Sequence, residues 1–244
     1  MIIVIGAGPA GLAAAEAAAR NGSDVALIDS ASRLGGQYWR HRSTVTGFHS
    51  HRADELFAKV RSAQSITYIS EASVWSIERE VELIRVNYLQ GGAEGSLTAE
   101  KLILATGAYD RSLPFPGWDK PGSMTPGAAQ ALLKGHGVLA GQKVVVAGTG
   151  PFLLPVATGL AQAGANIVGL YEAHSPLRWL LSPKALLLNI SKFGELIYYA
   201  RLLRQYSLTP QFGRVVSGFD KGRVTISRVN SSFALKDVKS KTVE

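Results

Sequence analysis

The first twenty residues join an apolar run, a glycine-rich turn and an alanine-rich run, and no other stretch constrains the fold as strongly. Residues 2–5 are branched and apolar, and residues 12–20 have strong helix propensity. Between them, Gly6, Gly8 and Gly11 have G-x-G-x-x-G spacing. Gly6 allows a tight turn, Gly8 lets the backbone approach a pyrophosphate, and Gly11 lets helix and strand pack closely. The stretch predicts a strand–turn–helix unit that binds phosphates at the helix N-terminus.

An acidic residue follows at the distance that such a unit needs. A second apolar run, residues 24–28, ends at Asp29, roughly 20 residues after the turn, where a carboxylate binds ribose hydroxyls. The alternative is a glycine-rich turn without a ligand. The glycine pair Gly35-Gly36 just beyond predicts a second close approach of the backbone to the ligand, or an ordinary turn.

Composition narrows the class of protein. The chain has 244 residues, is 46% hydrophobic and has no cysteine, which excludes disulfides, cysteine-ligated iron–sulfur clusters and a C-x-x-C pair. Its net charge of +8 is spread along the chain and is not interleaved with aromatic residues, so we expect no nucleic-acid partner. No uninterrupted apolar run reaches about 18 residues, so we predict a cytoplasmic protein without a membrane span.

A histidine-rich segment offers a metal site as an alternative. His41, His49 and His51 lie among arginines, with no cysteine and few carboxylates. Because metal ligation needs three or four preorganised donors, we favour a loop near a phosphate or a partner, and we predict no metal.

The middle of the first half predicts a β-meander. A helix is expected at residues 54–63. Alternating patterns at residues 66–69, 73–77 and 81–88 predict short antiparallel strands, with another near Leu97.

The next apolar run begins at Lys101 and ends in Ala105-Thr106-Gly107. Ligands bind at strand carboxyl ends in open α/β sheets, so Thr106 and Gly107 are expected beside the cofactor.

A proline-rich connector, residues 113–117, then predicts a domain boundary. We expect a dinucleotide-binding domain at residues 1–113, a second domain at 114–229 that opens with a helix at 125–134, and a disordered tail at 230–244.

The opening pattern returns in the second domain. A strand at residues 143–147 leads into Gly148-Thr149-Gly150-Pro151, then a helix and a strand that ends at Glu172. Leu153 occupies the position of the third glycine and is expected to push helix and strand apart. Glu172 favours NAD over NADP because a carboxylate repels a 2′-phosphate. The unit is either a second dinucleotide site or a structural relic.

The rest of the second half has weaker signals. Residues 176–208 predict two helices, separated around Ser191 and Gly194, that form either a cover for the sheet or a surface for a partner. Residues 214–219 and 223–229 predict a hairpin.

Several longer motifs resemble one family. The two glycine turns, Gly35-Gly36 and the Ala-Thr-Gly stretch resemble the flavoproteins with two dinucleotide-binding domains, the pyridine nucleotide–disulfide oxidoreductase superfamily. Within it, residues 35–40, 113–118, 124–134 and 147–155 are similar to opine oxidase A-type subunits, hydrogen cyanide synthase B-type subunits and proline dehydrogenase α subunits.

The resemblance implies two Rossmann-like parallel-sheet domains of the α/β class, the first with an inserted β-meander. It implies partners that are other subunits of a heteromeric flavoenzyme oxidising amino or imino acids. It also implies a nicotinamide nucleotide, or the relic of its site, near Gly148, Gly150, Pro151 and Glu172. The residues that it assigns to FAD are Gly6, Gly8, Pro9, Ala10, Gly11, Asp29, Gly36, Gln37, Val74, Ala105, Thr106 and Gly107.

The chain departs from its relatives beyond the hairpin. In the family the chain returns to the first domain, adds a last strand that meets the flavin, and in many members ends in an iron–sulfur module. Neither feature is present, so the first domain is expected to lack its last strand and the chain to be truncated.

Three functions follow from these patterns. The first is an enzyme subunit that moves a hydride or electrons between a nicotinamide nucleotide or organic substrate and FAD. The second is a truncated nucleotide-binding module or structural partner without redox activity, and the third is a stand-alone NADH–acceptor reductase. Hydride transfer to flavin needs orientation more than an acid or base, and none of His136, His174, Glu172 and Asp110 is predicted to be catalytic.

Overall fold

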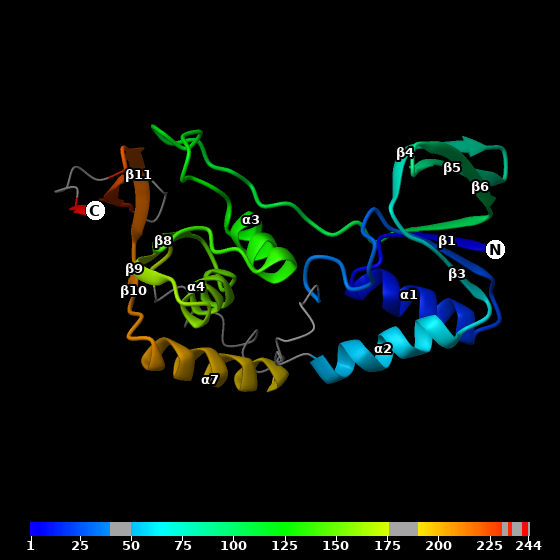
Figure 1. The fold of residues 1–244 in the computed structure, drawn as a ribbon, viewed down its shortest axis with the longest axis horizontal. Coiled ribbons are helices and arrows are strands. Elements are labelled where there is room, and N and C mark those ends of the chain that lie inside the picture. Colours follow the sequence, from blue (N-terminus) through cyan, green and yellow to red (C-terminus); the bar gives the residue numbers. More distant parts are fainter. Residues whose placement is uncertain (40–49, 176–189, 231–233, 236–240, 244) are drawn as a thin grey trace. The chain divides into compact units, whose positions relative to one another are not determined.

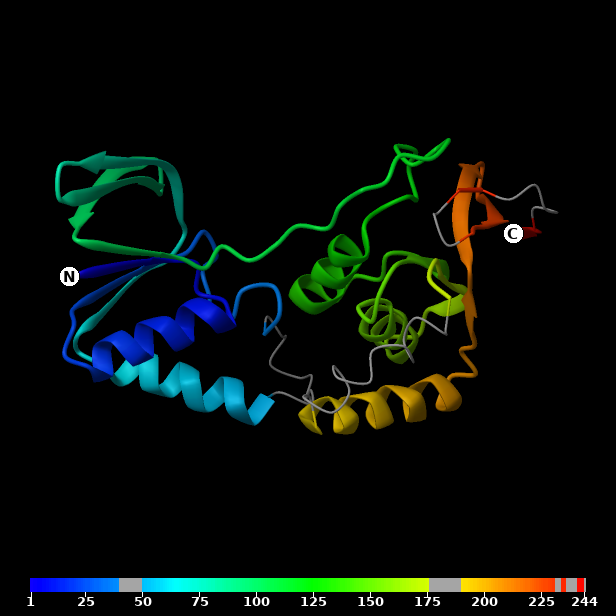
Figure 2. The same ribbon diagram turned by 180° about the vertical axis from the view of Figure 1, so that it is seen from behind.

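The computed structural model describes residues 1–39, 50–175, 190–230, 234–235 and 241–243. The chain divides into two compact units, Met1–Ala108 and Tyr109–Glu244. Figures 1 and 2 show the elements of each unit from opposite sides.

The first unit is built on a four-stranded parallel sheet in the order β3-β2-β1-β7. Helix α1 connects β1 to β2, and α2 precedes β3. Within the described residues β7 pairs only with β1, so it forms an edge of the sheet. The elements are β1 (Ile2–Ile5), α1 (Pro9–Arg20), β2 (Val25–Ile28), α2 (Ser50–Ser62), β3 (Ile66–Ile69) and β7 (Lys101–Leu104).

Alternating side chains of this sheet enter two different cores. Val4 and Leu27 pack with residues of α1 and α2. Ile3 and Ile28 point to the opposite face and pack with Val86 of the meander. Helices, sheet and meander therefore form three layers.

The inserted meander is confirmed, but its membership is corrected. It consists of the antiparallel strands β4 (Ala72–Glu80), β5 (Leu83–Gln90) and β6 (Ala93–Ala99). The prediction that residues 66–69 belong to it was wrong, because β3 pairs in parallel with β2. An alternating pattern indicates a strand but not its direction, whereas the crossover through α2 requires a parallel neighbour.

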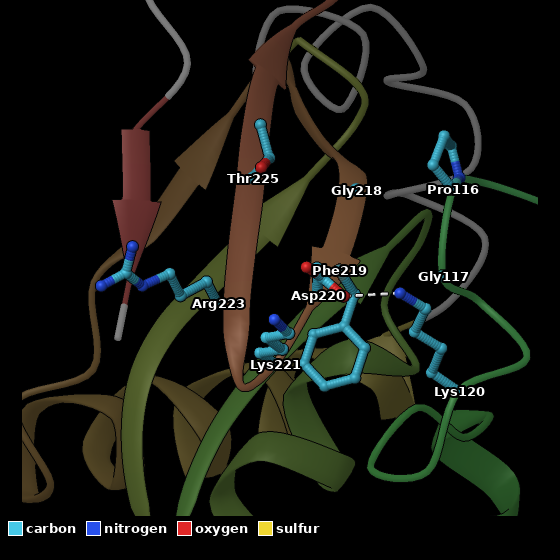
Figure 3. A pocket seen from close by; sticks show the side chains of 9 residues that line it. All are labelled: Pro116, Gly117, Lys120, Gly218, Phe219, Asp220, Lys221, Arg223 and Thr225. Atoms are coloured by element: carbon cyan, nitrogen blue, oxygen red, sulfur yellow. Dashed lines mark hydrogen bonds and ion pairs between the residues drawn. The ribbon is translucent and has the colours of Figure 1, made fainter.

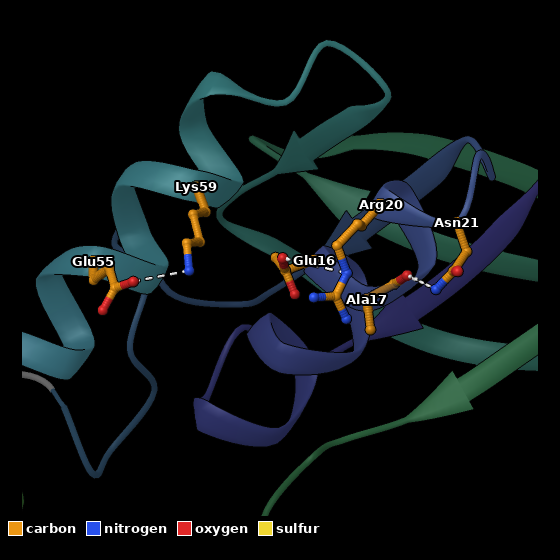
Figure 4. Close-up of polar contacts among 6 residues, drawn as sticks. All are labelled: Glu16, Ala17, Arg20, Asn21, Glu55 and Lys59. Carbon is orange, nitrogen blue, oxygen red and sulfur yellow. Dashed lines mark hydrogen bonds and ion pairs between the residues drawn. The ribbon is translucent and has the colours of Figure 1, made fainter.

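The outer surfaces of α1 and α2 carry ion pairs one helical turn apart (Figure 4). Glu16 and Arg20 approach to 3.9 Å, and Glu55 and Lys59 to 2.9 Å. The hydrogen bond to Glu55 raises the pKa of the Lys59 ammonium above its ordinary value. Such exposed pairs stabilise helices weakly, so the apolar inner faces hold these helices in place. Helix α2 starts at Ser50, earlier than the predicted start at residue 54.

The second unit repeats the strand–turn–helix–strand order. Its parallel sheet has the order β10-β9-β8. Residues of α4, including Val156 and Leu160, are buried against Val146 and Leu170, with Leu203 of α7 packed beside them. The elements are β8 (Lys143–Gly148), α4 (Leu153–Gln162), β9 (Asn166–Glu172), α7 (Ile190–Gln205) and β10 (Pro210–Phe212).

Two details of the helices differ from expectation. The helix predicted at residues 125–134 is α3 (Pro126–Ala131), followed by a π-helical turn, η1 (Leu132–His136), which ends at Gly137 with φ 66°. The break predicted around Ser191 and Gly194 was wrong, because α7 continues through both residues. One glycine in a helix costs only about 1 kcal/mol. Residues 176–189 lie outside the described part of the chain.

The predicted hairpin is present as β11 (Arg214–Asp220) and β12 (Arg223–Arg228). It gains a third strand, β13 (Lys241–Val243), which pairs with β12 inside the stretch expected to be a disordered tail. The tail prediction therefore fails for these three residues, because strand pairing does not need the apolar periodicity that the tail lacks.

Candidate dinucleotide-binding sites

The glycine turn of the first unit is closely packed. Gly6 has φ +103°, and a Cβ there would overlap the carbonyl oxygen of Ala105. A Cβ at Gly11 would overlap the carbonyl oxygen of Gly6. The structural roles predicted for Gly6 and Gly11 are therefore confirmed, because only glycine lets turn, helix and β7 meet at this distance.

At Gly8, by contrast, a Cβ would fit without overlap. Gly8 is the N-cap of α1 with φ −75°, and a Cβ there would meet only the Cα of Gly36, at 4.0 Å. Pro9 occupies the first position of the helix, where its missing N–H costs nothing. The amides of Ala10 and Gly11 in the first turn have no partner within the helix. Within the described residues, the first turn of α1 has no acidic side chain and no side-chain cap.

Asp29 fastens the glycine turn from the end of β2. Its Oδ2 accepts a hydrogen bond from the amide of Ala7 at 2.5 Å, and its Oδ1 accepts one from the amide of Ala31 at 2.7 Å. The side chain is half-buried. An ionised carboxylate has about four acceptor positions, so Asp29 keeps acceptor capacity toward a ligand.

The glycine pair lies across the same turn. The amide of Gly35 donates to the carbonyl oxygen of Ala7 at 2.8 Å. Gly36 has φ +56°, and a Cβ there would lie 2.9 Å from the Cα of Gly8. Gln37 follows and is exposed. Sequence reasoning missed Ala7, which joins Asp29 and Gly35 only through its backbone and so has no signal in its side chain.

The Ala-Thr-Gly stretch reaches the same edge of the sheet. The amide of Ala105 donates to the carbonyl oxygen of Ile5 at 2.8 Å, and Thr106 and Gly107 follow it in exposed positions. Val74, in contrast, is half-buried in β4 and packs on the core that contains Ile3. Contacts at this edge thus connect the residues Gly6, Gly8, Gly11, Asp29, Gly36 and Ala105. Val74 packs in a core instead.

The second unit gathers its predicted residues in the same way. Gly148 ends β8, Gly150 has φ +101°, Pro151 is exposed, and Glu172 ends β9 with only 4% of its surface exposed. The carboxylate accepts from the amide of Gly150 at 2.8 Å and from the amide of His174 at 2.9 Å.

The second turn differs from the first at its helix. Helix α4 begins at Leu153, and the amides of Leu153 and Leu154 donate to the carbonyl oxygens of Gly150 and Pro151 at 3.3 and 3.1 Å. Leu153 is buried, and its side chain would lie 3.2 Å from a Cβ at Gly148. The second turn thus has room for a leucine side chain at the position where the first turn admits only glycine.

A small apolar cavity of about 150 Å³ lies beside this second turn. Gly150, Glu172, Leu170 and Phe212 are among the residues that line it.

The described part of the chain has neither a metal-binding group nor a membrane-spanning helix. No group of three histidine, aspartate or glutamate residues there could hold a metal ion. His41 and His49 lie outside the described residues, and the side chain of His51 is not described. No described helix has both the length and the apolar character needed to cross a membrane.

Curated relatives share most of this chain but extend well beyond it. The A-type subunit of opine oxidase from Agrobacterium tumefaciens is 35% identical over 227 residues, covering 82% of this chain and 45% of that protein. The hydrogen cyanide synthase subunit HcnB of Pseudomonas protegens is 34% identical over 188 residues, covering 70% of this chain and 38% of the relative. The chain therefore spans less than half the length of these relatives.

Solved structures share the architecture. L-proline dehydrogenase from P. horikoshii is 28% identical, with a TM-score of 0.59, over 69% of this chain and 34% of that one. The bacillithiol disulfide reductase of Staphylococcus aureus covers 99% of this chain, and the match covers 72% of the reductase, with a TM-score of 0.63. At 19% identity it supports the fold alone.

A family model completes the comparison. The model for pyridine nucleotide-disulphide oxidoreductases matches residues 1–185, which include both glycine turns and both acids. The chain therefore belongs to the pyridine nucleotide-disulphide oxidoreductase family.

Proposed function

We propose that the first unit binds FAD and that the chain is the FAD-binding subunit of a heteromeric oxidoreductase. The observation that carries the proposal is the cradle at the carboxyl ends of β1, β2 and β7. There Gly8 and Gly36 approach so closely that a Cβ on Gly36 would lie 2.9 Å from the other residue. Asp29 and Ala7 hold the turn in this form. A diphosphate next to an uncapped helix end is what such backbone favours.

Each part of the cradle has a role toward FAD. The amides of Ala10 and Gly11 would hold the pyrophosphate, and Asp29 would accept hydrogen bonds from the ribose. Thr106 and Gly107, which follow β7 in the sequence, would line one side of the site. When bound, the flavin supplies hydride and electron transfer. This chemistry needs a positioned cofactor rather than a side-chain acid or base, which agrees with the absence of a predicted catalytic residue.

The substrate and partner are proposed from the relatives. Opine oxidase and hydrogen cyanide synthase are named as multi-subunit enzymes, so we propose that this chain has further subunits as partners. By analogy with these relatives, we also propose an amino- or imino-acid-type electron donor. The second unit would hold a nicotinamide nucleotide against Gly148, Gly150, Pro151 and Glu172. A cytoplasmic location fits this chemistry.

A second candidate is a nucleotide-binding module without redox activity of its own. The burial of Leu153 over Gly148 favours it, because the second turn is more filled than the first.

One experiment separates the two candidates. The purified chain is incubated with FAD, freed of unbound flavin, and its visible spectrum is recorded before and after anaerobic NADH. Bound flavin that is bleached by NADH supports the oxidoreductase with two occupied sites. Bound flavin that stays oxidised both with NADH and with amino- or imino-acid donors supports the module, and a colourless protein rejects FAD binding.

A further inference from the structure

A cavity of about 630 Å³ lies within the second unit. It lies between the hairpin and residues 109–125, the segment that contains the proline-rich connector and leads to α3 (Figure 3). Its volume falls in the range of pockets for small molecules, about 300–1,000 Å³. None of its lining residues lines the cavity beside the second glycine turn. The second unit therefore offers a space for a ligand apart from its dinucleotide turn.

Contacts within the second unit fix the segment that forms one wall of this cavity. Asp110 Oδ2 accepts a hydrogen bond from the amide of Gly127 at 2.5 Å, in the first turn of α3, and so fastens the start of the segment. Further along, the amide of Phe219 donates to the carbonyl oxygen of Pro116 at 2.8 Å. Gly117 has φ +89°, and a Cβ there would overlap the carbonyl oxygen of Phe219. Segment and hairpin are therefore joined through their backbones, and the cavity between them has a defined shape.

The hairpin supplies the opposite wall, where a glycine leaves room beside a hydroxyl group. Gly218 of β11 lies opposite Thr225 of β12 in the strand register. A Cβ at Gly218 would lie 3.6 Å from the Thr225 hydroxyl oxygen and 3.9 Å from the carbonyl oxygen of Pro116. Because residue 218 has no side chain, the hydroxyl lies beside open space. A hydroxyl can donate a hydrogen bond to a ligand there.

Positive charges predominate around the cavity. Of the described residues that line it, three are cationic and one is acidic. The ammonium of Lys120 lies 2.5 Å from a carboxylate oxygen of Asp220, so these two charges compensate each other. Lys221 and Arg223, at the turn between β11 and β12, bring two further positive charges. Cations that surround one space raise its electrostatic potential and favour an anion there.

Lys221 has a backbone conformation that a lysine rarely adopts. Asp220 pairs with Arg223, so Lys221 and Gly222 form a two-residue hairpin turn. Their φ angles are +45° and +80°, the signs of a type I′ turn, in which the first position favours asparagine, aspartate or glycine. Strained residues of this kind cluster at ligand sites. The cation at the cavity thus occurs where the turn alone would favour a different residue.

We propose that this cavity binds the phosphate group of a small organic phosphate, a ligand different from either dinucleotide. Lysine ammonium groups bind phosphate as point charges. Lys221, which forms no ion pair within the described part of the chain, supplies such a group. The Thr225 hydroxyl would donate a further hydrogen bond, and the remaining volume would hold the organic part. The site uses neither glycine turn, so the proposal does not depend on FAD binding.

Isothermal titration calorimetry of the full chain at low ionic strength tests the proposal, with glucose 6-phosphate as the probe. Glucose and citrate serve as comparison ligands without a phosphate group. Glucose 6-phosphate should bind, and its affinity should fall as salt is added, because salt screens the attraction. Glucose should not bind, and citrate should bind more weakly than glucose 6-phosphate.

Two variants and a control locate the binding. Lys221→Asn removes the charge and places at φ +45° a residue that this turn favours. The fold should therefore persist while affinity falls at least about tenfold, the loss of one charged hydrogen bond. Thr225→Val removes the hydroxyl, keeps a branched side chain and should weaken binding about threefold. Lys143→Asn alters an exposed lysine of the same unit outside the cavity and should bind as wild type does. Circular dichroism checks that each variant is folded.

Equal affinity of Lys221→Asn and Lys143→Asn for glucose 6-phosphate would overturn this site, as would an absence of binding to wild type. Citrate that binds as tightly as glucose 6-phosphate would overturn the assignment to phosphate. None of these results bears on FAD, which the visible spectrum of the chain tests separately.

Discussion

Asp29 and Glu172 occupy equivalent positions in the two units, although one residue more separates Glu172 from its glycine turn. In the first unit the pairing of β1 with β2 is regular from Ile2 to Ile5. In the second, Val144 pairs with Ile167 but Val145 pairs with Gly169, which leaves one extra residue in β9 as a bulge. The bulge absorbs the insertion and brings the acid back to the end of the strand.

The two acids also hold their turns by the same kind of contact. Asp29 accepts from Ala7, between the first two glycines, and Glu172 accepts from Gly150, one position further along its turn. The longer glutamate side chain accounts for the longer reach. In both units the acid therefore supports the glycine turn itself, a role that is separate from the predicted contact with ribose.

Removing the carboxylate of Asp29 should weaken both the turn and FAD binding. Asp29→Ala leaves the amides of Ala7 and Ala31 without their acceptor, and a hydrogen bond to a charged group contributes about 1.5–3 kcal/mol. We expect a lower midpoint in urea denaturation and a loss of bound flavin. Asp24→Ala removes an exposed acid at the other end of β2 and should change neither quantity. Equal flavin content in the two variants would contradict the role of Asp29.

Two glycine substitutions separate folding from ligand binding. Gly8→Ala places a Cβ at ordinary contact distance, 4.0 Å from Gly36, at a φ that alanine adopts. The free energy of unfolding should stay within about 0.5 kcal/mol of wild type, while FAD affinity falls at least about tenfold, or about 1.4 kcal/mol.

Gly11→Ala is the matched opposite. Its Cβ would overlap the carbonyl oxygen of Gly6, so the unfolding free energy itself should fall by about 1–3 kcal/mol. Chemical denaturation and flavin titration of both variants check the pair. Normal FAD affinity in Gly8→Ala would show that the pyrophosphate does not approach this residue.

The sequence predicted the parts of the fold that local chemistry determines. Gly6 and Gly11 are needed by contacts within the turn, and the acid at the end of the next strand belongs to the same short unit. The sequence motif therefore predicts the geometry of this unit. The direction of β3 and the pairing of β13 depend on distant strands and have no local signal. The roles of Ala7 and Asp110 were likewise missed, because one acts through its backbone and the other through a contact with Gly127.

The buried carboxylate of Glu172 should stabilise the second unit. Glu172→Gln keeps one acceptor oxygen but turns an NH₂ group toward either Gly150 or His174, leaving one amide unsatisfied. The expected loss is about 1–3 kcal/mol in unfolding free energy. Asp119→Asn, an exposed change in the same unit, serves as control. Urea denaturation followed by circular dichroism measures both, and equal midpoints would show that water replaces the carboxylate at no cost.

The half-buried Lys134 in η1 should make stability depend on pH. Burial lowers the pKa of its ammonium below the ordinary value of 10.5, so the unfolded chain binds more protons than the folded chain between the two values. Stability therefore rises with pH through this window, because the penalty for burying the charge is complete below the folded-state pKa and disappears above 10.5.

Lys134→Met removes the charge and retains an unbranched side chain. The difference in melting temperature between this variant and wild type should shift in favour of wild type as pH rises from the folded-state pKa toward about 10.5. Lys143→Met alters an exposed lysine at the start of β8 and serves as the control. Differential scanning calorimetry across the range checks both variants. A constant difference for Lys134→Met would show that this ammonium is fully solvated in the folded protein.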